Sequence, residues 1–197
     1  MNVAADTETA EAEVWLIRHG ETEWSLSGQH TGVTDLPMTD AGEAAAKALH
    51  DILAGTSFDL VLCSPRRRAR RTAELAGFTD VHIEQDLVEW DYGDYEGRTR
   101  ADIHEERPDW SIWTDGAPHG ETPDEIGARV DRVIAKCRAA GGRVLLFSHG
   151  HLLRTLAARW IAQPVTVGAH LPLDTAKVCV LAYDRGLPTL DRWNATQ

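Results

Sequence analysis

Four consecutive apolar residues, at positions 14–17, end directly on Arg18, His19 and Gly20. An uninterrupted apolar run of this length is typical of a strand that is buried on both faces of a parallel sheet. Gly20 lets the chain turn out of the strand, which places Arg18 and His19 at its carboxyl end, where open α/β sheets bind their ligands. The stretch therefore indicates an anion-binding site with a nitrogen nucleophile. Taken alone, it also fits a hydrogen-bonded histidine that merely closes a strand.

Two further apolar runs end on similar side chains. Residues 143–147 are followed by a serine and then by His149 and Gly150, and residues 58–63 lead into five arginines between positions 66 and 71. Because the carboxyl ends of parallel strands lie at one edge of a sheet, we expect these groups to converge with His19 around one cavity. Guanidinium groups bind phosphate bidentately, so the cavity is predicted to be a phosphoryl-transfer site. The arginine cluster equally fits the solvated face of a basic helix.

Expulsion of an alcohol from a phosphate monoester requires a proton donor opposite the nucleophile, because an alkoxide is a poor leaving group. Glu89 is the best candidate, since Trp90 and Tyr92 beside it would desolvate the carboxyl group and raise its pKa. Three more acids in the same stretch compete for this role: Asp91, Asp94 and Glu96.

Strand-like and helix-like segments alternate along the chain, which predicts an α/β fold with a mostly parallel sheet between two helical layers. Helices are expected at 39–53, from 64 to about 76, at 122–140 and at 152–160, and further strands at 81–83 and 178–183, the last of them at an edge. Thr39 is a natural N-cap, Ser64 with Pro65 resembles a cap followed by proline at the first helical position, and Thr122 opens a capping box.

The 197-residue chain has the length of one domain, with 43% hydrophobic residues and a net charge of −11. We expect a flexible tail over residues 1–13 and a single domain over residues 14–197. The acidic charge argues against a nucleic-acid partner, and no apolar run is long enough for a membrane helix. Three cysteines without paired spacing indicate a reducing compartment, so the prediction is a cytoplasmic protein, with a homodimer through the 178–182 strand left open.

Four ordered motifs resemble the histidine phosphatase superfamily, in its phosphoglycerate mutase-like branch. They are Arg18-His19-Gly20-Glu21-Thr22-Glu23-Trp24, Ser64-Pro65 with Arg68-Ala69 and Thr72-Ala73, the segment 89–97, and Ser148-His149-Gly150. The resemblance extends from residue 14 to about residue 183. It implies the fold of that family, His19 as the nucleophile that becomes phosphohistidine, and Glu89 as the proton donor. It also implies a phosphate site made by Arg18, Arg68 and His149, with Ser25 and Gly150 beside them; many members have Asn at the position of Ser25.

The segments 25–37 and 90–97 are most similar to the branch that contains sugar-bisphosphatases and actinobacterial acid phosphatases. Substrate contacts are expected from Gln29, His30, Thr31, Gly32, Trp90 and Tyr92, and a mouth or lid from Trp110, Trp113 and His119. The expected activity is hydrolysis of small phosphorylated metabolites such as sugar phosphates or phosphoglycerates. A phosphoglycerate mutase is the alternative, although the stretch 90–122 offers only three arginines to retain a bisphosphate. A non-catalytic phospho-ligand module is the third reading.

Two other classes of phosphatase fit the sequence less well. A cysteine phosphatase needs an arginine six positions after its cysteine, and the sixth residue after Cys63 is Ala69. A metal-dependent phosphoesterase needs several aspartates and histidines at the strand ends, where this chain carries arginines that would repel a cation. We therefore expect no metal and no other cofactor, and a turnover rate that a chelator leaves unchanged.

Overall fold

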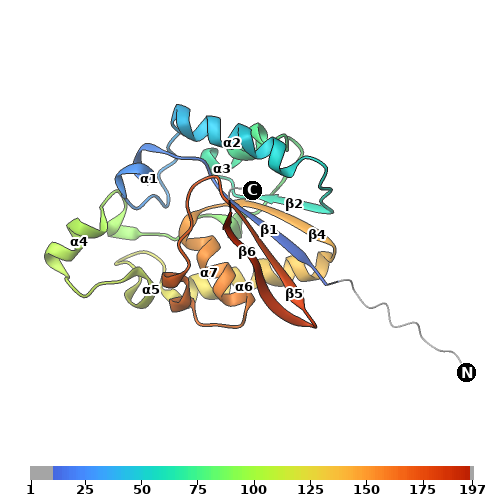
Figure 1. Ribbon diagram of the computed structural model, residues 1–197. Coiled ribbons are helices and arrows are strands. Elements are labelled where there is room, and N and C mark those ends of the chain that lie inside the picture. The colour runs from blue at the N-terminus through green and yellow to red at the C-terminus, as the bar shows by residue number, and fades with distance from the viewer. Residues whose placement is uncertain (1–10, 196–197) are drawn as a thin grey trace, which may run out of the picture.

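The structure of the protein is a computed structural model that describes residues 11–195 (Figure 1). The tail predicted over residues 1–13 falls mostly outside this range. At its end, Ala12 is already buried, and the first strand begins at Glu13.

A six-stranded sheet forms the centre of the fold, in the spatial order β3-β2-β4-β1-β5-β6. Its strands are β1 (Glu13–Arg18), β2 (Leu60–Cys63), β3 (His82–Ile83), β4 (Arg143–Ser148), β5 (Val178–Asp184) and β6 (Leu187–Ala195). The first four in this list run parallel to one another, whereas β5 is antiparallel to β1 and β6 is antiparallel to β5. The predicted α/β fold with a mostly parallel sheet is confirmed.

Helices cover both faces of the sheet (Figure 1). On one face, α2 (Asp40–Leu53) and α3 (Arg67–Leu75) bury Leu49, Ala69 and Ala73 against Phe147 and Leu145 of β4. On the other face, the long α6 (Pro123–Ala140) and α7 (Gly150–Trp160) enclose the larger of the two cores, which includes Leu146 and Leu16. Successive residues of each central strand point into opposite cores, which explains why these strands read as unbroken apolar runs.

Two predicted helix starts are confirmed, and one is wrong. The hydroxyl of Thr39 accepts the N–H of Gly42 at the start of α2, and Thr122 forms a full capping box with Glu125, followed by Pro123 at the start of α6. The arginine helix, however, begins after Arg66, without a side-chain cap. Ser64 lies two residues before the N-cap position, and its Oγ lies 2.8 Å from His149 Nε2, a partner supplied by another strand end.

The last predicted strand is wrong in its position within the sheet. β5 is internal, and β6, which was not predicted, covers it and forms the edge. Arg185 and Gly186 join the two strands with φ angles of 51° and 79°, as a tight two-residue hairpin requires. A dimer through residues 178–182 would therefore have to displace β6, and β6 is the strand whose edge is open.

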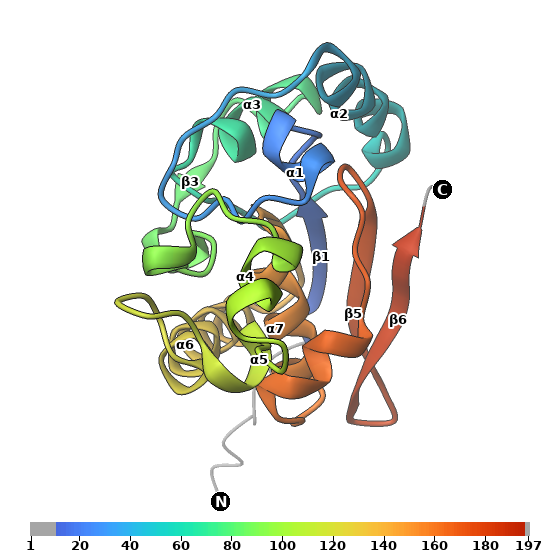
Figure 2. The same ribbon diagram turned by 90° about the vertical axis from the view of Figure 1, so that its left-hand side faces the viewer.

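Short helices occupy the segments whose sequences show no clear hydrophobic periodicity. They are α1 (Glu23–Ser27), α4 (Arg100–Glu106), α5 (Ile112–Asp115) and the 3-10 turns η1 (Gln85–Leu87), η2 (Gly93–Tyr95) and η3 (Val165–His170). In Figure 2, α1 lies beside the carboxyl end of β1, and α4 and α5 are drawn lower in the view, in front of α7. Within residues 11–195, no helix combines the length and apolar character that a membrane crossing demands.

Candidate active site

The three predicted strand ends converge at one edge of the sheet. Arg18 is in register with Ser148 across β1 and β4, and Cys63 of β2 is in register with Phe147 of β4. The backbone N–H of His19 continues the ladder by donating to the carbonyl of Ser148 at 2.9 Å. As a result, the imidazole rings of His19 and His149 lie 5.2 Å apart, centroid to centroid.

His19 is held in one orientation with its second nitrogen unengaged by the protein. Its Nδ1 lies 2.7 Å from the carbonyl of Gly20, and because a carbonyl only accepts, we assign the proton to Nδ1. The turn itself is fixed by Thr72, whose hydroxyl accepts the N–H of Gly20 at 2.9 Å. Burial, and then the charges of Arg68 and Arg18, hold the pKa of His19 well below its ordinary value. Nε2 of the neutral ring thus keeps a free lone pair.

Three side chains near His19 carry buried donors without partners. Among the described residues, the buried side-chain atoms that lack a hydrogen-bond partner include Arg18 Nε, Arg68 Nε and His149 Nδ1. The other ends of these side chains are tied down: Arg18 donates to Leu173 O at 2.6 Å, and Arg68 donates to Thr34 O at 2.9 Å. Buried polar atoms normally have partners, so three unpaired donors around one imidazole indicate a ligand with several acceptor oxygens.

The hydrogen bond with Ser64 determines which ring nitrogen of His149 carries the proton. The N–H of Arg66 points at the Ser64 hydroxyl at 3.4 Å, which leaves the hydroxyl proton to be donated to His149 Nε2. The proton of the neutral ring is then on Nδ1. Burial and the charge of Arg68 lower the pKa of His149 well below its usual range. The ring therefore keeps an Nδ1–H without a protein partner and carries no charge.

Glu89 is held at the start of α7 by backbone groups. Its Oε1 accepts the N–H groups of Trp90 and Leu152, both at 2.9 Å, and its Oε2 accepts the N–H of His151 at 3.0 Å. Only 7% of Glu89 is exposed. The sequence described an apolar environment for this carboxyl group, and the structure adds three polar donors to it. Since Oε2 accepts a single hydrogen bond, it keeps a lone pair for a proton.

A cavity of about 180 Å³ opens beside these groups. Of the predicted site residues, those that line it are Arg18, His19, Ser25, Gln29, His30, Thr31, Glu89, Tyr92 and Gly150. Glu89 is its only acidic wall residue in the described chain. The three competing acids are used elsewhere: Asp91 accepts the N–H of Gly93, Asp94 bonds His119, and Glu96 accepts the N–H groups of Gly32 and Thr34.

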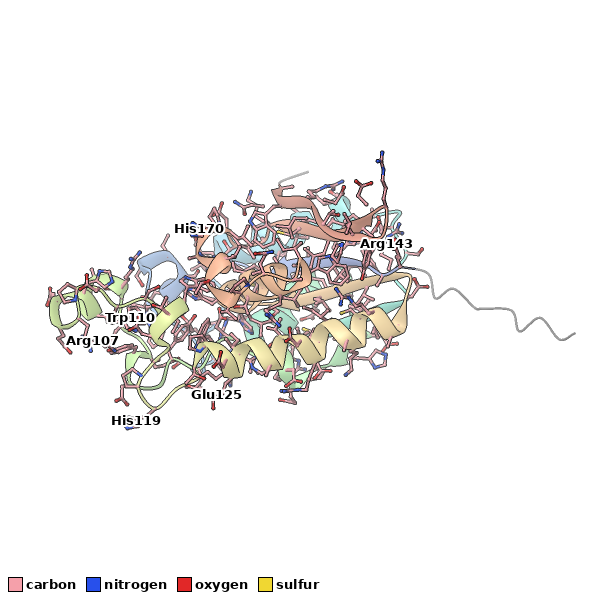
Figure 3. The ribbon with its side chains drawn as sticks, turned by 90° about the horizontal axis from the view of Figure 1, so that it is seen from below. Arg107, Trp110, His119, Glu125, Arg143 and His170 are labelled. Carbon is pink, nitrogen blue, oxygen red and sulfur yellow. The ribbon has the colours of Figure 1, made fainter. Side chains whose placement is uncertain are left out.

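Several predicted site residues lie outside the cavity wall. Arg68 and His149 are fully buried behind it. Gly32 is held by Glu96, and Trp90 is a core residue whose indole N–H donates to Glu121 O. His119, whose side chain is 85% exposed, projects from the far end of the molecule in Figure 3 and does not approach the cavity. The structure therefore places neither Trp90 nor His119 where it could contact a substrate.

The hydroxyl of Ser25 is engaged in a helix cap. It accepts the N–H of Thr22 at 2.8 Å and donates its proton to Thr22 O at 2.9 Å, completing the capping box of α1. Ser25 borders the cavity, but its one proton is directed away from any phosphate there.

Other cavity residues were not selected from the sequence. His151 and Arg154 line the wall from α7, joined by Trp24, Gly28 and Leu173. The two α7 residues are three positions apart, so they share one face of a mostly apolar helix. This pair of polar residues is the sequence feature that could have identified them. Arg129 of α6 was also missed. It is buried, it donates to Val88 O at 2.7 Å, and it pairs with Glu121, so it fixes the segment that ends on Glu89.

The buried histidines predict that the folded protein becomes less stable as the pH falls. Burial lowers the pKa values of His19, His149 and His151 well below the ordinary value of histidine. Burial also lowers the pKa of His30. Below about pH 6.5 the unfolded chain binds protons that the folded chain does not. The free energy of unfolding should then fall on acidification by about 1.4 kcal/mol per pH unit for each such histidine. Urea midpoints at pH 7.5, 6.5 and 5.5 check this, and an unchanged midpoint contradicts it.

At one edge of the mostly parallel sheet lie two buried histidines, two arginines with unpaired donors and one cavity carboxylate, which are the groups expected of a phosphatase site. The chain belongs to the histidine phosphatase superfamily: the family model described as "Histidine phosphatase superfamily (branch 1)" matches residues 14–196. The resemblance seen in the sequence is confirmed, and with it the assignment to the phosphoric monoester hydrolases.

Known relatives agree with this assignment. An acid phosphatase of Mycobacterium tuberculosis is 40% identical over 179 residues, covering 89% of this chain and 88% of its own. A sedoheptulose 1,7-bisphosphatase of Saccharomyces cerevisiae is 39% identical, covering 74% of this chain and 66% of its own. The solved structure of the alpha-ribazole phosphatase from Shigella flexneri has a TM-score of 0.81 and 34% identity, and covers 93% of this chain and 96% of its own.

Proposed function

We propose that the protein hydrolyses phosphate monoesters of small metabolites through a phosphohistidine on His19. The observation that carries the proposal is the set of three unpaired buried donors on Arg18, Arg68 and His149, whose side chains lie near His19. A transferring phosphoryl group has three equatorial oxygens that gain from fixed donors, and phosphoryl transfer depends mainly on such positioning and electrostatic stabilisation.

The reaction then takes place in two steps. His19 Nε2 attacks phosphorus while Glu89 gives a proton to the departing alcohol oxygen. The ionised Glu89 next takes a proton from a water, whose oxygen attacks the phosphohistidine and releases phosphate. Gly150 matters for the geometry, because a Cβ at this position would lie 3.3 Å from Arg18 Cζ and Nε, so a side chain there would press on the guanidinium.

The cation count at the mouth favours hydrolysis over a mutase reaction. A mutase must hold a bisphosphate while it turns. Of the three arginines between residues 90 and 122, Arg98 pairs with Glu106 and Arg107 pairs with Asp115. The cavity wall itself contains Arg18 and, from α7, Arg154. Acidic partners thus neutralise two of the cations that a mutase would need.

Turnover of a panel of phosphorylated metabolites tests the proposal. We expect release of inorganic phosphate from sugar phosphates and from 3-phosphoglycerate, with isomerisation of 3-phosphoglycerate at less than about a tenth of that rate, since the site has few means to retain a bisphosphate. Phosphate release and isomer formation are scored separately. Isomerisation faster than phosphate release would make the protein a mutase.

The proposal treats residues 14–197 as one phosphatase domain, supported by the family match over residues 14–196. We place it in the cytoplasm. The supporting observation is that Cys63, Cys137 and Cys179 are free and buried, with burial raising their thiol pKa values to about 12, 12 and 11. Such thiols are poor nucleophiles and neither form disulfides nor need them. The proposed partners are small phosphate monoesters. That the protein needs no metal ion and binds no nucleic acid remains a prediction.

A further inference from the structure

Two histidines of the cavity wall have no part in the proposed chemistry. His30 follows α1, and His151 is the second residue of α7. Their rings stack with centroids 6.1 Å apart and an interplanar angle of 22°. Tyr92 packs against both, with its ring centroid 4.6 Å from that of His30 and 5.8 Å from that of His151. Both histidines border the same cavity as His19 and Glu89.

The hydrogen bond of His30 fixes its tautomer. Its Nδ1 lies 2.8 Å from the carbonyl oxygen of Arg98. A carbonyl oxygen has no proton to give, so Nδ1 carries the proton and donates it. Burial lowers the pKa of His30, which leaves the neutral ring with a bare Nε2. That nitrogen is a pure hydrogen-bond acceptor.

The hydrogen bond of His151 fixes the opposite tautomer. Its Nδ1 lies 2.6 Å from the hydroxyl of Tyr92. Tyr92 is buried, and its hydroxyl has no other partner in the described part of the chain. A phenol is a good donor and imidazole nitrogen a good acceptor, so we assign the proton to the tyrosine oxygen in this bond. His151 then carries its own proton on Nε2, which makes that nitrogen a donor.

Both Nε2 atoms are missing from the hydrogen bonds of the described residues, and neither is among the buried atoms without a partner. Both are therefore accessible, on side chains that line the cavity of His19 and also a second cavity with Trp110 and Trp113. Gln29 beside them is already engaged, since its amide donates to Gly97 O and accepts from Ser27.

We propose that His30 and His151 form an acceptor and donor pair that binds neighbouring hydroxyl groups of the leaving alcohol. The proposal deepens the proposed function, on which it rests, by selecting substrates whose phosphate is carried by a polyhydroxylated chain. One substrate hydroxyl accepts from His151 Nε2–H, and the next donates to His30 Nε2. A second phosphate or a carboxylate only accepts, so it cannot satisfy His30.

The test compares two substrates that differ only in their hydroxyl groups. Glycerol 3-phosphate and propyl phosphate have the same carbon chain, and we expect kcat/KM to favour the first by at least about tenfold, because a site built to bond hydroxyls leaves its polar groups unpaired with the second. The ratio of the two kcat/KM values should fall below about threefold in His30→Phe and in His151→Phe, which keep a ring but remove the nitrogen. His30→Gln, which restores an acceptor near the Nε2 position, should recover part of the preference.

Two controls separate the pair from general damage. His170 is exposed, lies on η3 away from His119 and Trp110 in Figure 3, and has no part in the cavity wall, so His170→Phe should keep the wild-type ratio. A ratio that stays at tenfold in His30→Phe and His151→Phe overturns the proposal, as does a wild-type ratio near one.

Nitrogen-15 chemical shifts give a readout that needs no turnover. At neutral pH they should report an Nδ1–H tautomer for His30 and an Nε2–H tautomer for His151. Identical tautomers overturn the pairing even if the enzyme is an active phosphatase. Conversely, loss of the proposed phosphohistidine mechanism would be seen at His19 and would leave these shifts unchanged, so the two failures are distinguishable.

Discussion

Replacement of His19 by alanine is expected to reduce phosphate release by more than about 10³-fold, because removal of a covalent nucleophile leaves only the residual rate that binding groups supply. The three unpaired donors would remain in place, so inorganic phosphate or vanadate should still bind. The measurement is the initial rate with glycerol 3-phosphate. In the wild type, alkaline quenching should also trap one acid-labile phosphate per chain, absent from His19→Ala.

His170→Ala is the matched control for this substitution. It removes an imidazole of the same size from the exposed η3 segment, where no hydrogen bond of the described residues involves the ring. Its rate should equal that of the wild type within experimental error. Full activity in His19→Ala would remove the nucleophile from the mechanism, and phosphate binding without any turnover in the wild type would identify a binding module.

Glu89→Gln should lower turnover of alkyl phosphates by about 10²- to 10⁴-fold, the usual contribution of a positioned proton donor. The loss should be much smaller with p-nitrophenyl phosphate, whose phenolate leaves without a proton. This difference in leaving-group dependence is the diagnostic result, since a general distortion of the site would slow both substrates alike.

The amide of glutamine cannot accept the N–H of His151 with its nitrogen end, so some local rearrangement at the start of α7 is expected. Thermal unfolding of Glu89→Gln and of the neighbouring Asp91→Asn serves as the control. Asp91 bonds the N–H of Gly93 in the same segment and does not line the cavity. Equal losses for the two leaving groups in Glu89→Gln would assign the proton transfer to another group.

The sequence was most informative where local pattern and tertiary structure agree. The apolar runs of β1, β2 and β4 are continuous because both faces of each strand are buried, and their ends therefore located His19 and His149 correctly. Among four nearby acids, by contrast, local chemistry could not distinguish Glu89. Its selection came from the family resemblance, and in space it follows from backbone donors on α7, which are 62 and 63 positions away in the chain.

The failures have identifiable physical causes. Ser64 looked like a helix cap, but a histidine from another strand end takes its hydroxyl. Residues 187–195 contain a proline, and the consecutive polar residues Asp191 and Arg192 interrupt the alternation expected of a strand, which hid an edge strand whose partner is its immediate neighbour β5. α4 has a single buried residue, Ile103, so it has no apolar stripe to recognise. In each case the local structure depends on contacts that form only when the chain folds.

The first turn of α7 has a consequence for how specificity can change. His149 caps the helix, His151 reaches the cavity, and the N–H groups of residues 151 and 152 hold Glu89. Because the helix rises about 1.5 Å per residue, one short turn thus sets the distances among His149, Glu89 and the part of the cavity wall that His151 contributes. New substrates are then most readily accommodated by the opposite wall, contributed by α1 and the loop after it. There, side chains can be exchanged without altering the spacing on which catalysis depends.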